Sequence, residues 1–303
     1  MRNKFGTYLL IALFWPLSKL PLKVHYWISP AIAFLVGKVF RYRRDTVVYN
    51  MSRAFPEMTC WEIADRVNAF YRHLADVIVE AVWFGGCSQK RLRKAHIAEI
   101  ANPEEIERLF NVSPSVMILC SHAGNWEISG GMESYNYTDR NFPLSVDNIR
   151  ITYREMSSKA WDGFFRRNRM RPSSEGVHYK GYIESKEVVR YVMRHASDKF
   201  AYHFITDQRP YYSNSGNMKV TFMGLECTTM SAGAALAHKM GMSVCYLNMS
   251  ATGRGLYTYS YKTICEDASR MSVEDIMGKY YQLLEEEIRL HPFNYLWTHR
   301  RWC

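Results

Sequence analysis

The chain has 303 residues, of which 48% are hydrophobic and 22% are charged, and its formal net charge at pH 7 is +10. This composition excludes an intrinsically disordered protein, and the length is enough for one or two domains with a substantial core. The seven cysteines are scattered without a C-x-x-C spacing, which argues against a cysteine-based zinc site and favours a reducing cytoplasm.

The excess positive charge lies at the N-terminus. Residues 1–53 contain nine lysines and arginines and one acid, a net charge of +8, whereas the rest of the chain has 30 basic and 28 acidic residues, a net charge of +2. The same segment contains two apolar runs, Tyr8–Trp15 and Ala31–Val36. Basic residues interleaved with apolar ones are typical of binding to an anionic membrane surface, and the apolar content argues against nucleic acid as a partner.

Neither apolar run is long enough to span a bilayer, which takes about 20 apolar residues, and no signal-peptide cleavage site follows them. We therefore predict that residues 1–57 form a basic and apolar helical segment that associates with a membrane, and that residues 58–303 form the main domain. The alternative is that the N-terminal helices only cover the core of that domain.

The main domain has the pattern of an α/β protein. Thr59 and Glu62 have the spacing of a capping box, which predicts a helix start, and apolar residues continue with helical spacing until Gly85-Gly86. Further helices are predicted over residues 103–110, 157–169, 186–195, 230–240 and 272–290, and strands over residues 116–120, 146–153, 200–205, 218–222, 243–248 and 256–263. This alternation of strands and helices indicates a layered α/β domain.

The most informative segment is Ser121–Glu127, with the sequence SHAGNWE, which follows the buried strand predicted over residues 116–120. A loop at the end of a strand is a common place for reactive side chains. His122 and Glu127 are five residues apart, so they meet only if His122 lies in the turn and Glu127 in the first turn of the next helix. His122 could then act as a general base whose tautomer is fixed by the Glu127 carboxylate. The same spacing also fits a structural histidine beside a glutamate that starts a helix.

Five further segments along the chain belong to the same pattern: Asn50–Glu57 (NMSRAFPE), Tyr153-Arg154, Asp207-Gln208, Phe222–Gly224 (FMG) and Leu296–Trp302 (LWTHRRW). Together with the HxGNWE motif they resemble, in content and order, the bacterial lipid A biosynthesis late acyltransferases, relatives of the glycerolipid acyltransferases that carry an HxxxxD motif. The resemblance covers nearly the whole chain, from about Met1 to Trp302.

This resemblance implies a glycerolipid-acyltransferase-like fold with a mixed central sheet flanked by helices, and makes residues 58–303 a catalytic acyltransferase domain. It implies that a fatty acyl chain moves from a thioester, of acyl carrier protein or coenzyme A, to a hydroxyl of a lipid A-type glycolipid, without a cofactor or a metal. It places the enzyme at the cytoplasmic face of the bacterial inner membrane. Another acceptor, such as a glycerophospholipid, an amino-acid lipid or an aryl pigment, remains an alternative.

In this interpretation the oxyanion of the reaction needs hydrogen-bond donors. The candidates are the backbone N–H groups near Gly124 and Asn125 and the guanidinium of Arg154, whose fork also suits a phosphate. Asp207 ends a predicted strand and is a further candidate for substrate binding, although an aspartate that caps a turn is equally common. The arginines of residues 166–171 could dock an acidic carrier protein or a phosphorylated sugar, or they could form a solvated helix face.

Two other classes of protein fit parts of the pattern. A hydrolase could hold a divalent metal through histidines and carboxylates, here His122, Glu127, His203 and Asp207, although the HExxH spacing is absent. A non-catalytic lipid-binding protein at the membrane would fit the N-terminal segment without requiring a catalytic histidine.

Overall fold

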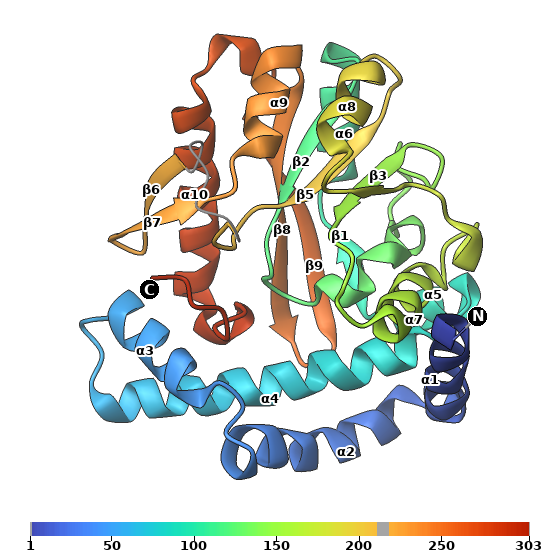
Figure 1. The fold of residues 1–303 in the computed structure, drawn as a ribbon, viewed down its shortest axis with the longest axis vertical. Coiled ribbons are helices and arrows are strands. Elements are labelled where there is room, and N and C mark those ends of the chain that lie inside the picture. Colours follow the sequence, from blue (N-terminus) through green and yellow to red (C-terminus); the bar gives the residue numbers. More distant parts are fainter. Residues whose placement is uncertain (1, 211–217, 303) are drawn as a thin grey trace.

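The computed structural model describes residues 2–210 and 218–302 of the chain. Its strands are β1 (Ala98–Ile100), β2 (Val116–Cys120), β3 (Ile149–Tyr153), β4 (Tyr182–Glu184), β5 (Ala201–Ile205), β6 (Met218–Phe222), β7 (Leu225–Thr229), β8 (Ser243–Gly253) and β9 (Leu256–Cys265). Seven of them form one sheet with the order β1-β9-β8-β2-β5-β3-β4, while β6 and β7 form a separate hairpin (Figure 1). Neighbours in the large sheet are parallel, except for the antiparallel pair β8–β9. The predicted α/β class with a mixed central sheet is confirmed.

Helices cover both faces of this sheet. They are α1 (Arg2–Lys19), α2 (Leu22–Phe34), α3 (Arg44–Ala54), α4 (Cys60–Phe84), α5 (Gln89–Ala95), α6 (Pro103–Val112), α7 (Lys159–Met170), α8 (Val188–Arg194), α9 (Ala232–Met240) and α10 (Val273–Leu290), with a π-helical turn η1 (Leu35–Val39) and 3-10 turns η2 (Trp126–Ser134), η3 (Gly176–His178), η4 (Ala268–Arg270) and η5 (Pro292–Asn294). Helices α8, α9 and α10 pack on one face, and α5, α6 and η2 pack on the other.

The strand β2 shows why the sequence before the SHAGNWE motif is apolar at every position. All five of its side chains are buried. Met117 and Leu119 pack in the hydrophobic cluster that includes α9 and α10, whereas Val116 and Ile118 pack in the cluster that includes α6 and η2. A parallel strand covered by helices on both faces needs such a continuous apolar run rather than an alternating one.

Helix α4 closes one end of the sheet and carries the N-terminal helices. Its start is the predicted capping box, because Thr59 and Glu62 each accept a hydrogen bond from the other's backbone N–H. Its first half contributes Phe70 to one hydrophobic cluster, and its second half contributes Phe84 to the other. In Figure 1, α4 runs across the lower end of the sheet, with α2 beside it, α1 near one end and α3 near the other.

The N-terminal helices expose many large apolar side chains, which include Phe5, Leu9, Leu13, Trp27, Phe34 and Phe40. Within the described part of the chain, no one helix combines the length and the apolar character that crossing a membrane requires. The helices over Phe5–Lys19 and Leu22–Val39 meet those criteria only as a pair, and they are bent by 116° at the break between them.

Helix α3 belongs to the core as well as to the N-terminal segment. Val47, Met51 and Phe55 are almost completely buried in the same cluster as Met117 and Leu119 of β2. The division that we predict at residue 57 therefore runs through a continuous hydrophobic core.

Most predicted elements have their counterparts in the structure. The strands predicted over residues 116–120 and 218–222 have the same bounds as β2 and β6, whereas β8 continues to Gly253. The edge strands β1 and β4 were not predicted, because three residues are too few to show a periodicity. The hairpin strand β7 and the short helix α5 were not predicted either.

Candidate functional site

Two neighbouring parallel strands place His122 beside Asp207. The strands β2 and β5 are in register to their last residues, Cys120 and Ile205, and each of the two side chains follows two residues later. His122 Nδ1 lies 2.9 Å from Asp207 Oδ1, and the backbone N–H of His122 donates to Asp207 Oδ2 at 3.1 Å. In α/β proteins, ligand-binding and catalytic sites usually lie at the carboxyl ends of the parallel strands, where the strand order reverses.

The contacts of Asp207 determine which nitrogen of His122 carries the proton. An ionised carboxylate only accepts hydrogen bonds, so Nδ1–H donates to Asp207 and Nε2 is the nitrogen that accepts. Asp207 is 1% exposed, and burial alone would raise its pKa. The charge of His122 and its two hydrogen bonds outweigh that effect and hold the pKa of Asp207 below its usual value. The pair is thus a base with a fixed tautomer.

A second imidazole, that of His299, lies close to His122. Gln208 Nε2 lies 3.1 Å from His122 Nε2, 3.2 Å from His122 Nδ1 and 2.7 Å from His299 Nε2, so one amide group lies against both rings. Burial, followed by the charge of His122, lowers the pKa of His299 to about 4, which leaves His299 neutral and able to accept. Neither Gln208 nor His299 was among the predicted site residues, although both belong to motifs that the sequence shows.

Glu127, which we predict to orient His122, makes its hydrogen bonds elsewhere. It lies in the first turn of η2, as its spacing from His122 required. Its carboxylate, however, accepts from Arg169 Nε at 2.7 Å and Nη2 at 2.6 Å and from Trp126 Nε1 at 3.0 Å. Burial would raise the pKa of Glu127, but the Arg169 charge and the hydrogen bonds hold it below its usual value. Arg169 and Glu127 thus form a bidentate ion pair. The carboxylate that is hydrogen-bonded to His122 Nδ1 is therefore that of Asp207.

Asn125 fixes the shape of the loop between His122 and η2. Its side-chain oxygen accepts the Glu127 N–H at 3.1 Å, and its Nδ2 donates to Glu80 Oε2 at 2.7 Å. Glu80 is completely buried and also accepts from the hydroxyls of Tyr26 and Tyr257, each at 2.7 Å. Burial raises the pKa of Glu80 to about 7, against the opposite effect of these hydrogen bonds. This network ties the loop to α2, α4 and β9.

Gly124 also helps to hold the loop in place through its backbone hydrogen bonds. Its N–H, which we predict as an oxyanion donor, donates to the carbonyl oxygen of Asn294 at 2.8 Å, and its own carbonyl accepts from His73 Nε2 at 3.3 Å. Its φ is +68°, and a Cβ at this position would lie 2.6 Å from the carbonyl oxygen of Met249. Both observations require glycine here.

Gly124→Ala is expected to lower the free energy of unfolding by about 2 kcal/mol or more, since a left-handed conformation costs a non-glycine residue about 1–3 kcal/mol, and the Met249 backbone must also move. Gly224→Ala is the matched control, because Gly224 has a φ of +74° but nothing within 4 Å of the added Cβ. Chemical denaturation of both variants measures the difference. Equal losses of unfolding free energy in the two variants would show that the close contact with Met249 adds no cost.

The predicted arginines do not form one patch. Arg154 is exposed and directly follows β3, the neighbour of β5, so it lies at the same edge of the sheet as His122. Arg166 stacks on two tyrosine rings, at 4.7 and 5.1 Å from their centroids, and Arg169 binds Glu127. The remaining two, at 167 and 171, face α1.

The closing LWTHRRW motif is mostly buried and lies beside the N-terminal NMSRAFPE segment. Asn50 Nδ2 donates to the carbonyl oxygens of Trp297 at 2.9 Å and His299 at 2.5 Å. Trp297 is fully buried, and Arg301, which is 2% exposed, donates to the hydroxyl of Tyr281 at 2.7 Å. Two motifs from opposite ends of the chain thus hold His299 beside His122.

No group of three histidine, cysteine, aspartate or glutamate residues within 2–210 and 218–302 is arranged to hold a metal ion. His203, considered for a metal site, lies in β5 and is 7% exposed, and burial lowers its pKa to about 4. The geometry at the sheet edge is that of an imidazole beside a buried carboxylate, which suits proton transfer.

No curated protein matches the chain. The family model of the bacterial lipid A biosynthesis acyltransferases matches residues 1–303, which includes the N-terminal helices as well as the sheet and its covering helices. That family implies a lipid acceptor and an acyl donor as substrates. Because the match extends over the entire chain, this protein belongs to the bacterial lipid A biosynthesis acyltransferase family.

Proposed function

We propose that this acyltransferase moves a fatty acyl chain from the thioester of acyl carrier protein or coenzyme A to a hydroxyl of a lipid A-type glycolipid, at the cytoplasmic face of the bacterial inner membrane. The hydrogen bond of 2.9 Å between His122 and the buried Asp207 carries the proposal, because it gives an acyltransferase of this family a base with a fixed tautomer.

In the proposed reaction His122 Nε2 takes the proton of the acceptor hydroxyl as its oxygen attacks the thioester carbonyl. The ionised Asp207 stabilises the imidazolium that forms. The tetrahedral intermediate then expels the thiolate, and His122 returns the proton to the sulfur. The products are an ester and a thiol, and no covalent enzyme intermediate is needed.

Gln208 has a part in this scheme, because its amide nitrogen lies against the His122 ring, 3.1 Å from Nε2 and 3.2 Å from Nδ1. The acceptor hydroxyl would displace that amide from the imidazole. The released N–H group would then lie next to the reacting centre, where it could donate to the oxyanion. The exposed Arg154 at the same sheet edge is proposed to contact a phosphate or the oxyanion.

The N-terminal helices support a position at the membrane. Phe5 is 72% exposed, Trp27 78% and Phe40 73%, and the basic residues Lys38 and Arg41 are exposed near the last of these. Exposed aromatic side chains beside basic ones fit the interface of an anionic bilayer, where the rings enter the headgroup region and the cations attract the lipid charge. The exposed apolar area argues against the alternative in which these helices only cover the core.

The proposal is tested by mass spectrometry of lipid extracts from a bacterial host that lacks its own late acyltransferases. We expect the wild-type protein to add one acyl mass to lipid A and His122→Ala to add none. His195→Ala is the matched control, because His195 also bonds an aspartate, Asp198, at 2.7 Å but lies at the surface.

An acyl mass gained by another lipid, such as a glycerophospholipid, would retain the mechanism and reject the glycolipid acceptor. An acyl mass that His122→Ala still adds would reject His122 as the base.

A further inference from the structure

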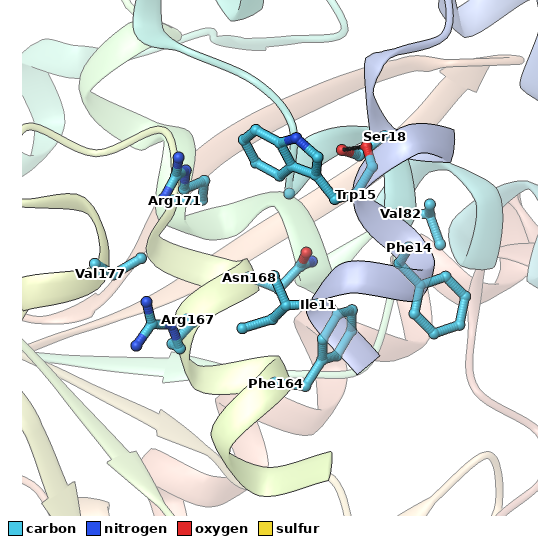
Figure 2. A pocket seen from close by; sticks show the side chains of 11 residues that line it. Ile11, Phe14, Trp15, Ser18, Val82, Phe164, Arg167, Asn168, Arg171 and Val177 are labelled. Carbon is cyan, nitrogen blue, oxygen red and sulfur yellow. Dashed lines mark hydrogen bonds between the residues drawn. The ribbon is translucent and has the colours of Figure 1, made fainter. Parts of the chain in front are cut away.

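A second feature of the molecule lies away from His122, between α1 and α7. It is a recess of about 440 Å³, counting the part open to solvent, and neither His122 nor Asp207 lines it. Figure 2 shows Ile11 and Trp15 of α1 on one side of it and two arginines, Arg167 and Arg171, on the other. Most of the remaining lining is apolar.

The two arginines are one helical turn apart and project to the same side. Arg171 lies 5.2 Å from the centroid of the Trp15 ring, and Arg167 lies 5.7 Å from that of Tyr8. Within the described residues, neither guanidinium makes a hydrogen bond or an ion pair with a carboxylate. The two guanidinium groups at the rim of the recess are therefore not paired with an anionic side chain of the described residues.

Other cations next to the recess increase its positive potential. Lys19 lies 3.8 Å from the centroid of the Trp15 ring, on which Arg171 also stacks. Burial, followed by the nearby charges of Arg91 and Arg171, lowers the pKa of Lys19. Arg91 itself donates hydrogen bonds to backbone carbonyl oxygens at the end of α1, the closest at 2.6 Å, and so caps that helix end.

The apolar lining of the recess indicates where the anion would come from. Ile11, Phe14 and Trp15 of α1 line it beside the two arginines, whereas the exposed residues Phe5, Leu9 and Leu13 lie on the other side of α1. A ligand with an anionic head and an apolar part matches a cationic recess with such a lining.

We propose that the recess between α1 and α7 is a docking site for the phosphate headgroup of an anionic membrane lipid, held by Arg167 and Arg171. The two arginine forks match the phosphate oxygens, and the apolar part of the lipid lies against the apolar lining of the recess. The site rests on the proposed membrane location, and it goes beyond the acyl transfer itself because the lipid bound there is not the substrate. It would hold α7, and through Arg169 the Glu127 loop, at a fixed position relative to the bilayer.

The test is sedimentation with vesicles of phosphatidylcholine that contain phosphatidylglycerol, at constant ionic strength. Arg167→Gln/Arg171→Gln is expected to lower the partition coefficient roughly 10- to 30-fold, since each basic residue near an anionic surface contributes about a fivefold change or slightly less. Lys279→Gln/Arg289→Gln removes the same charge from the exposed side of α10 and should leave partitioning unchanged. Equal losses in the two double variants would overturn the proposal, because they would reflect net charge alone.

Val177→Phe distinguishes a headgroup bound inside the recess from a general attraction of the vesicle to positive charge. Val177 lines the recess, and the larger side chain should fill it while both arginines stay in place. We expect this variant to lose vesicle affinity as well, and unchanged affinity would overturn the recess as the site. Thermal melting shows whether each variant is folded, and a variant of the arginines that only melts earlier while binding normally would identify them as helix-end stabilisers and reject the proposal.

Two further measurements distinguish the ligands. If the arginine variant lost affinity for inorganic phosphate or for soluble acyl carrier protein but bound vesicles normally, the lipid site would be rejected in favour of that ligand. His122→Ala should bind vesicles like the wild type. Its failure to transfer acyl groups and a failure of headgroup docking are therefore separate results.

Discussion

Asp207→Asn is expected to lower kcat/KM by roughly 10³- to 10⁴-fold, the effect seen when the carboxylate behind a catalytic histidine becomes an amide. Asparagine has the same shape, so the buried position stays filled. Its NH₂ group, however, can face the ring and favour the tautomer with the proton on Nε2 of His122. That tautomer has no lone pair for the acceptor hydroxyl, so the base is lost while the fold is kept.

The measurement is steady-state kinetics with an acyl thioester donor and a detergent-solubilised acceptor, together with thermal melting. Asp198→Asn is the matched control, because Asp198 bonds His195 Nδ1 at 2.7 Å and is 47% exposed. It should leave kcat/KM unchanged. His122→Ala/Asp207→Asn should be no slower than His122→Ala alone, because the two groups act as a unit. A loss of less than about tenfold for Asp207→Asn would rule out a catalytic unit of this kind.

The pH dependence of stability follows from the direction of the Asp207 pKa. The pKa is held below the usual 3.8 in the folded protein, so the ionised carboxylate contributes stability above pH 3.8, and this contribution is lost as the pH falls through the folded pKa. At neutral pH the carboxylate is charged, so the difference in rate between the wild type and Asp207→Asn is not a protonation effect of the aspartate.

The local part of this site could be predicted from the sequence, because it depends on neighbouring residues. The apolar run of β2 predicted a buried strand, and the turn chemistry after it placed His122 in the loop and Glu127 in the first helical turn. The capping box at Thr59 was likewise a local signal and has its predicted hydrogen bonds. Short-range patterns of this kind fix the elements and their ends.

The pairing of His122 with Asp207 could not be predicted in the same way. It requires β5 to lie between β2 and β3, although β3 precedes β5 in the chain, and no local pattern reveals that order. The bond between Glu127 and Arg169 joins residues that are 42 positions apart, so it depends on how α7 packs. By its spacing alone, Glu127 remained as good a partner for His122 as Asp207.

Glu80 is a different case, since a signal was present. It lies three residues after Val77 and four residues before Phe84, both buried, so the helical period puts it on the buried face of α4. A carboxylate on that face needs hydrogen-bond partners, and the structure provides three, from Tyr26, Tyr257 and Asn125. The residue could thus have been identified as part of a buried network, although its partners could not.

Arg169→Met is expected to lower the free energy of unfolding at neutral pH by about 3 kcal/mol, the lower end of the cost of leaving one charge of a buried pair without its partner. The lower end applies because the Arg169 side chain is 38% exposed, whereas that of Glu127 is 11% exposed. Lys159→Met is the matched control on the same helix. Its ion pair with Glu155 is exposed, so its loss should lower the free energy of unfolding far less.

Chemical denaturation at two pH values tests the cause of this loss. In the wild type the pKa of Glu127 is held below 4.5, so the pair contributes stability above pH 4.5 and loses it as the pH falls through the folded pKa. Without Arg169, burial is opposed only by the weaker effects of the Trp126 hydrogen bond and the His122 charge, so the pKa of Glu127 rises. The deficit of Arg169→Met should therefore be largest at neutral pH and shrink towards pH 4.5, and Glu127→Gln/Arg169→Met should recover much of it.

The same variants decide what Glu127 does for His122. If Glu127 only anchors the loop to α7, Glu127→Gln should lower stability and kcat/KM together, and the double variant should regain both in parallel. If Glu127 acts on His122 during the reaction, Glu127→Gln should lower kcat without a matching loss of stability, and removing Arg169 as well should not restore it. With the expected loss for Asp207→Asn, the first result would assign the orienting carboxylate to Asp207, at the end of β5, and leave Glu127 as the link between the loop and α7.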